Sequence, residues 1–116
     1  MTRIFYLHYH QDELAKRVAA LRAAGYVVTS HWSTASPPKV PKDLPDAFVI
    51  SLDRLPSHGR ALAEWVWEAK KRQHIPIVFE GGEPEKVAAT QAKFPRATYC
   101  STGQVATALA KLGVKP

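Results

Sequence analysis

Short apolar runs alternate with stretches of helical periodicity along most of this chain. The most continuous run covers residues 47–50, and turn residues follow it at Pro56 and Gly59. A run of this kind is typical of a strand buried on both faces of a parallel sheet. Similar runs at residues 4–7, 26–29, 75–79 and 98–100 bring the predicted number of strands to five.

The first segment between these runs has the spacing of an amphipathic helix. From Asp12 onward, Leu14, Val18 and Leu21 recur at helical intervals, with acidic side chains at the start, where they suit the helix dipole. Gly25 is typical of the residue that follows a helix. The chain therefore opens with a strand, a helix and a second strand.

A second helix is predicted over residues 60–73, and its apolar residues are Leu62, Trp65, Val66 and Ala69. We expect Ser57 to cap this helix, with Pro56 outside it. Trp67 falls on another side, which predicts one exposed large aromatic residue. Two shorter helices follow: one lies between Pro84 and Pro95, and Thr102 would cap the other.

The segment between the second and third runs breaks this rhythm. Its four prolines, at positions 37, 38, 41 and 45, leave room for at most one helical turn over residues 39–44. A parallel crossover normally carries a full helix, so we predict an abbreviated, Pro-rich crossover between strands 2 and 3. A compact packed connector is the simpler interpretation, and a binding loop is the alternative.

Strands alternating with helices predict an α/β fold, a three-layer sandwich around a five-stranded parallel sheet. The flavodoxin-like strand order 2-1-3-4-5 is the natural arrangement for five strands of this length. With 116 residues, the chain is predicted to form a single domain over residues 1–116. No apolar run approaches the length of a membrane span, so no membrane association is expected.

Charge and cysteine content add two expectations. Cys100 is the only cysteine, which excludes an internal disulfide and favours a cytoplasmic location. The formal net charge is +6, and no acidic residue follows Glu85. We therefore predict a basic partner surface in the C-terminal part of the chain, made by Trp67, Lys86, Lys93, Arg96 and Lys111. Nucleic acid is not expected as a partner, because no helix is continuously basic.

Polar side chains gather after the predicted strands, at the sheet edge where α/β proteins bind ligands. The candidate residues of this edge are His8, His10, Ser51, Asp53, Arg54, His58 and Arg60. Histidines and arginines would suit a phosphorylated or carboxylated ligand, or an enzyme acting on one, with His8, Asp53 and His58 at its centre. Neighbouring Ser57 and His58 carry no nucleophile motif, and no paired-ligand motif supports a metal, so no catalytic residue, metal or cofactor is predicted.

The chain resembles the receiver domain of bacterial response regulators over nearly its whole length. It has the same five-strand rhythm, an apolar third strand, and a Pro and a Gly before the third helix of that family. In that family the phospho-accepting Asp lies eight positions before this Gly. The corresponding position here, counted back from Gly59, holds Ser51, and Asp53 lies two residues further on. Its acidic pair for Mg²⁺ is replaced by His8 and Tyr9.

Two further family positions also differ. Glu80 and Gly81 stand where the family has Ser or Thr, and the segment 100–102 stands where it has Lys. Phosphoryl transfer needs these groups together, and Asp53 alone would remain as a hard oxygen ligand for Mg²⁺. The resemblance thus implies a degenerate receiver, a non-enzymatic signalling or protein-interaction module that is not phosphorylated on Asp. It also implies a protein partner, or self-association, at the basic C-terminal side.

Overall fold

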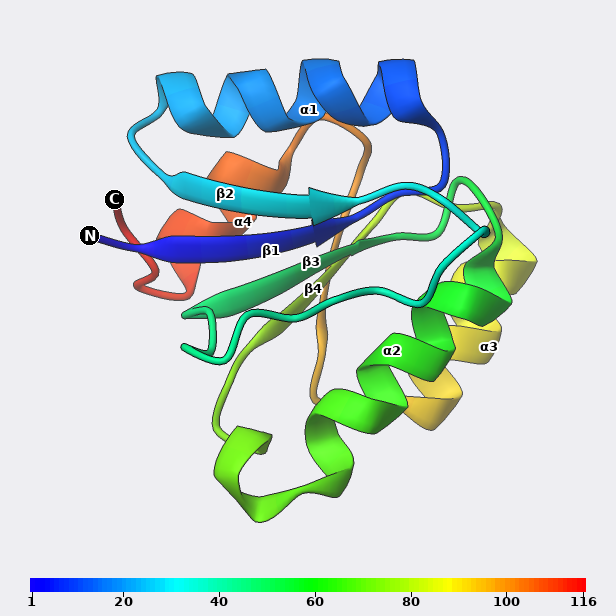
Figure 1. Ribbon diagram of the computed structural model, residues 1–116. Helices are drawn as coiled ribbons and strands as arrows, with labels where there is room; N and C mark the ends of the chain where they lie inside the picture. The colour runs from blue at the N-terminus through cyan, green and yellow to red at the C-terminus, as the bar shows by residue number, and fades with distance from the viewer.

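A parallel sheet of five strands forms the centre of the molecule (Figure 1). The computed structural model describes all residues from 1 to 116. The strand order is β2-β1-β3-β4-β5, which confirms the predicted flavodoxin-like order. The strands are β1 (Arg3–Leu7), β2 (Val27–His31), β3 (Ala47–Ser51), β4 (Ile77–Glu80) and β5 (Thr98–Cys100). All four strand pairs are parallel, and Ser51 at the end of β3 lies opposite Glu80 at the end of β4.

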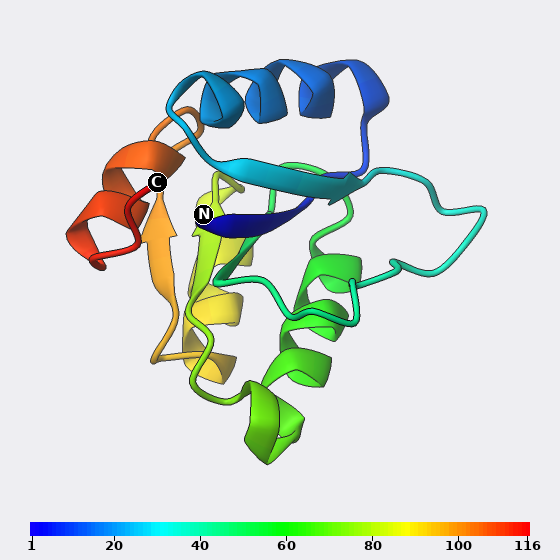
Figure 2. The same ribbon diagram turned by 60° about the vertical axis from the view of Figure 1, so that its left-hand side comes forward.

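Helices cover both faces of this sheet. Helix α1 (Gln11–Ala23) and helix α4 (Val105–Lys111) pack on one face, where Leu14, Val18 and Leu109 are buried. Helix α2 (Pro56–Glu68) and helix α3 (Pro84–Lys93) lie on the other face, as Figures 1 and 2 show. All five residues of β3 are buried, because this strand lies between two neighbours and under helices on both sides.

Helix α2 begins earlier than the sequence predicted. Pro56 is its first residue rather than a residue outside it, and Leu55 takes the N-cap position with a left-handed φ of 46°. The predicted cap at Ser57 is therefore wrong. Proline suits the first helical position, since its fixed φ is helical and an N–H there has no partner within the helix. The helix ends at Glu68, and a short 3-10 turn (Lys70–Arg72) replaces its predicted last residues.

The two tryptophans of α2 exchange their predicted roles. Trp67 is half-buried: its ring packs on Phe94 and its indole N–H donates to the carbonyl of Ile75 at 2.9 Å. Trp65 is the exposed one, with 37% of its surface accessible. The approach of α3 decides this difference, because Phe94 at its end covers the side of α2 that carries Trp67.

The connection from β2 to β3 contains no helix, as its prolines predicted. It runs beside α2 as an extended segment (Figure 2), and Val40 and Leu44 pack against the core beneath it. The two ends of the chain meet at the opposite edge of the sheet from the candidate site. There the Thr2 hydroxyl donates to the carbonyl of Lys115. No helix has the length and apolar character that a membrane crossing requires.

Candidate functional site

Asp53 is the centre of a hydrogen-bonded cluster at the carboxyl edge of the sheet. Its Oδ1 accepts the backbone N–H of Gly82 at 2.8 Å. Its Oδ2 accepts from the Arg17 guanidinium at 3.0 Å and from the Thr102 hydroxyl at 2.9 Å. Burial alone would raise the pKa of Asp53, but these three donors outweigh it and hold the pKa below its ordinary value. Both carboxylate oxygens are thus engaged by the protein itself.

Arg17 links this carboxylate to a second, buried one. Its Nη1 lies 3.1 Å from Oε1 of Glu80, and 3.4 Å from the Ser51 hydroxyl. The Glu80 side chain is only 1% exposed, and the Arg17 side chain 15%. Burial disfavours the charged guanidinium, yet the carboxylates of Glu80 and Asp53 outweigh that effect and raise the pKa of Arg17.

Glu80 is fully provided with donors. Besides Arg17, the Tyr6 hydroxyl donates to its Oε1, and the backbone N–H of Gly103 donates to its Oε2 at 2.9 Å. Burial, followed by the negative charge of Glu80, raises the pKa of Tyr6 and keeps the phenol protonated. A carboxylate with this set of partners can remain charged inside the protein.

Glycine backbone shapes the floor beneath Asp53. Gly81 has φ of +71°, and a Cβ built on it would collide with the Asp53 carboxylate. Gly82 has φ of +97°, and a Cβ there would lie 2.7 Å from Leu52. The carboxylate can therefore approach the backbone and accept from Gly82 only because two glycines stand at this turn.

A second set of contacts centres on Glu13 in the first turn of α1. Nε2 of His8 lies 2.8 Å from its Oε1, and Arg54 donates to its Oε2 at 2.7 Å. The hydrogen bonds from Arg54 and His8 lower the pKa of Glu13 to about 2. His10 caps the helix, because its Nδ1 accepts from the backbone N–H of Glu13 at 3.2 Å. Of the residues predicted to bind an anionic ligand, His8 and Arg54 are thus engaged by the carboxylate of Glu13.

The predicted edge residues do not form one site. Ser51 and Asp53 belong to the Arg17 cluster, whereas His8, His10 and Arg54 surround Glu13. His58 lies apart from both and faces Tyr9, with ring centroids 5.2 Å apart. Arg60 makes no hydrogen bond or ion pair with any of these residues, and its Nη1 is buried without a partner.

Sequence reasoning missed Arg17, Glu80, Tyr6 and Glu13 as members of these clusters. Glu80 carried a usable signal, because a charged residue that completes a buried strand requires a cationic or hydrogen-bonding partner. The predicted cap role of Thr102 is wrong: Gln104 takes the N-cap position of α4, and the Thr102 hydroxyl donates to Asp53. The prediction that Asp53 is the only hard oxygen ligand nearby is also wrong, since Glu80 shares Arg17 with it.

The clusters lack the composition of a metal site. No group of three or more His, Cys, Asp or Glu side chains is placed to hold an ion. Cys100 ends β5 near Glu80, and burial together with this carboxylate raises the pKa of its thiol to about 11. The chemistry of this edge is therefore that of a self-neutralised ion-pair network.

The predicted partner residues occupy both layers of the molecule. Lys86 and Lys93 are exposed on α3, Arg96 follows this helix, and Lys111 ends α4 on the opposite face of the sheet. The half-buried edge strand β5 lies between the two helices. Lys93 pairs with Glu64 at 3.1 Å, and the Arg96 guanidinium lies over the Trp67 ring, 4.4 Å from its centroid.

No protein-family model matches this sequence, and no curated protein does either. Solved structures do match. The alignment with the bacteriophytochrome response regulator AtBRR covers 98% of this chain and 94% of that protein, with a TM-score of 0.74 and 15% sequence identity. The alignment with the bacteriophytochrome response regulator RtBRR covers 98% of this chain and 79% of that protein, with a TM-score of 0.69 and 14% sequence identity.

A third similar structure comes from Chloroflexus aurantiacus J-10-fl and is assigned to the response regulators. Its alignment covers 86% of this chain and 84% of that protein, with a TM-score of 0.69 and 20% sequence identity. Together with the strand order, these similarities show that the chain has the flavodoxin-like fold of a response-regulator receiver. The predicted resemblance is confirmed at the level of the fold.

Proposed function

We propose that this chain is a receiver-like signalling module that acts through protein contacts and is not phosphorylated on Asp53. One observation carries this proposal: both oxygens of Asp53 are engaged, and the cation beside them is the guanidinium of Arg17. A receiver carboxylate needs a free oxygen to attack phosphorus and a metal ion to offset the phosphate charge.

Displacing Arg17 with a metal ion would be costly. The same guanidinium neutralises Glu80, which is almost fully buried. Removing one partner from such a pair leaves an uncompensated charge in the interior, which typically costs about 3–5 kcal/mol. A hydrated Mg²⁺ would also have to lose water to enter between these side chains, which it does reluctantly. The charge balance at this edge of the sheet therefore favours the Arg17 guanidinium over a bound Mg²⁺.

A direct test combines amide NMR with intact-mass measurement. The protein is titrated first with Mg²⁺ and then with acetyl phosphate, while the resonances of Ser51, Asp53 and Gly81 are followed. We expect no saturable shift and no mass increase by a phosphoryl group. Saturable shifts together with a phosphoryl adduct that Asp53→Asn abolishes would show instead that Asp53 is an acceptor.

Arg17→Met provides the matched comparison for this experiment. It removes the resident cation but keeps an unbranched side chain of similar length. If Mg²⁺ shifts the resonances only in this variant, the Arg17 guanidinium is what prevents Mg²⁺ from binding in the original protein. Lys16→Met, an exposed change one residue away on α1, should behave as the original protein does. The response of the two variants thus separates the role of the guanidinium from a general loss of positive charge.

We propose the surface formed by α3, β5 and α4 as the place of protein contact. It carries the exposed cations Lys86, Arg96 and Lys111, together with a half-buried strand edge. Sedimentation equilibrium at low and high salt tests self-association there. Because like charges repel across such an interface, salt and Lys111→Glu should both strengthen a dimer, whereas Lys16→Glu on α1 should not. A monomer under all conditions would direct the search to an acidic partner protein.

A further inference from the structure

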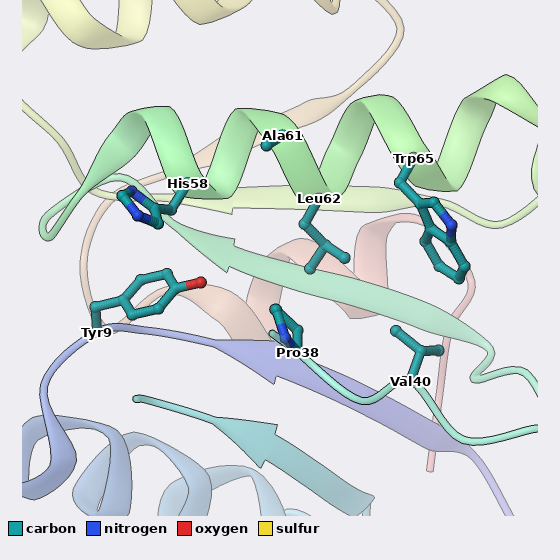
Figure 3. A pocket seen from close by; sticks show the side chains of 7 residues that line it. All are labelled: Tyr9, Pro38, Val40, His58, Ala61, Leu62 and Trp65. Atoms are coloured by element: carbon teal, nitrogen blue, oxygen red, sulfur yellow. The ribbon is translucent and has the colours of Figure 1, made fainter. Parts of the chain in front are cut away.

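The absence of a helix between β2 and β3 leaves a groove beside α2. The groove has a volume of about 430 Å³ and lies between α2 and the Pro-rich connector (Figure 3). It is lined by Tyr9, Pro38, Val40, His58, Ala61, Leu62 and Trp65. We propose that this groove binds an uncharged, planar aromatic small molecule of one or two rings, independently of the Asp53 cluster.

Apolar walls face each other across the groove. Ala61 and Leu62 are neighbours on one turn of α2, Trp65 lies one turn further on, and Pro38 and Val40 come from the connector opposite (Figure 3). Such walls match the ring faces of an aromatic ligand, because burial of apolar surface is the main source of affinity in small-molecule sites. A volume of this size lies within the range of typical ligand pockets, roughly 300–1,000 Å³.

Two of the walls are held in place before any ligand arrives. The Arg72 guanidinium lies over the Trp65 ring, 3.7 Å from its centroid, and is itself fixed by a hydrogen bond of 2.8 Å to the Trp65 carbonyl. At the other end, Tyr9 contacts His58 edge-on and lies 6.1 Å from the His31 ring. Ordered aromatic walls lose little conformational entropy on binding, which favours affinity.

The lining also indicates which chemistry it accepts. No Asp, Glu, Lys or Arg side chain lines the groove, so a charged ligand would lose hydration without gaining a counter-ion. The Tyr9 hydroxyl, the His58 ring and the Trp65 indole N–H form no hydrogen bond within the protein. These groups can serve a ligand hydroxyl or ring nitrogen, which is the arrangement of a mainly apolar pocket with a few orienting polar groups.

A small molecule fits the groove better than a peptide helix does. A helix with its side chains is about 10–12 Å across, and a docking face for it extends over several turns. Here the groove is bounded at one end by Tyr9 and His58, and on its sides by α2 and the connector. The groove is open to solvent on one side, and its volume of about 430 Å³ suits a ligand of one or two rings.

Titration with 2-naphthol, followed by amide NMR of the full chain, tests the proposal. We expect saturable shifts confined to Tyr9, Lys39, Val40 and residues 58–65. The anion 2-naphthoate should bind at least tenfold more weakly, because the lining offers it no cation. The variant Ala61→Phe places a ring in the groove from an exposed helix position and should weaken 2-naphthol binding at least tenfold. Ala110→Phe makes the same change on α4 and should leave binding unchanged.

Four outcomes would overturn the proposal. The first is no saturable shift at millimolar 2-naphthol, and the second is binding of 2-naphthoate as tight as that of 2-naphthol. The third is binding that survives Ala61→Phe in a variant whose spectrum shows it to be folded. Shifts of these same resonances with protein concentration, in the absence of probe, would assign the groove to a second copy of the chain and would also contradict the proposal.

Discussion

Arg17 and Glu80 form an ion pair, with 3.1 Å between Nη1 and Oε1, at a point where the glutamate is almost completely buried. The pair joins the second turn of α1 to the end of β4, and the same guanidinium reaches Asp53 after β3. One side chain therefore connects three elements of the sheet edge. Its charge matters both for the stability of the protein and for what this edge can bind.

Replacing Arg17 by Met should destabilise the protein by about 3 kcal/mol or more, because Glu80 is left charged and buried without its counter-ion. Urea unfolding measures this loss. The double variant Arg17→Met with Glu80→Gln should recover a large part of it, since the buried charge is then absent. If the double variant is less stable than the single one by the full cost of a second independent change, the two residues are not coupled.

Gly81→Ala should destabilise the protein more than Gly103→Ala does. Both glycines have positive φ, so alanine is strained by about 1–2 kcal/mol at either position. Only at Gly81 does the added methyl group meet another side chain, the Asp53 carboxylate, whereas nothing lies within 4 Å of a Cβ at Gly103. The difference between the two unfolding free energies therefore measures how tightly Asp53 is held. Equal losses would show that the carboxylate moves aside freely.

Cys100 should react slowly with thiol reagents at pH 8. A pKa of about 11 in place of 9.0 leaves roughly a hundredfold less of the reactive thiolate. The rate of modification by 5,5′-dithiobis(2-nitrobenzoic acid) should rise by about that factor when the protein is unfolded in urea. If the folded and unfolded proteins are modified at similar rates, the thiol is accessible and ionised in the folded state. That result would contradict the prediction that burial at the end of β5 protects it.

The stability of the protein should fall as the pH is lowered below about 6.5. Burial, only partly opposed by the hydrogen bond to Glu13, lowers the pKa of His8 in the folded state. The unfolded chain therefore binds a proton on His8 at a higher pH than the folded protein does, and acid favours unfolding by up to about 1.4 kcal/mol per pH unit. Well above pH 6.5 both states are neutral at this residue, and its effect vanishes.

Urea unfolding at several pH values checks this dependence. His8→Gln should flatten the slope between pH 6.5 and 5, whereas His74→Gln, an exposed change, should not. Glu13 affects a separate range: its pKa of about 2 in the folded protein means that its contribution is lost only as the pH falls below about 4.5. An unchanged slope in His8→Gln would contradict the assignment of the effect to His8.

The fold could be predicted because its signals are local. Each strand is a short apolar run, and the prolines between β2 and β3 exclude a helix by their own geometry. The exposure of Trp65 instead of Trp67 could not be predicted in this way. It depends on how closely α3 approaches α2 through Phe94, and spacing within one helix contains no information about a neighbouring helix.

The site was predicted only in part for the same reason. That polar residues gather at the carboxyl ends of the strands follows from the topology, and Ser51 and Asp53 are indeed there. That Arg17 reaches across from α1 to join Asp53 and Glu80 depends on three elements at once. Similarly, the position of His58 on the groove depends on the early start of α2, which requires the left-handed conformation of Leu55.

The contact between Thr2 and Lys115 has a practical consequence for work with this protein. Both chain ends lie at the amino edge of the sheet, whereas Asp53 and its neighbours lie at the carboxyl edge (Figure 1). A fluorophore, an affinity handle or an attachment to a sensor surface at either end would therefore point away from the ion-pair cluster. Immobilised protein would present this cluster to the solution, whichever end is used for the attachment.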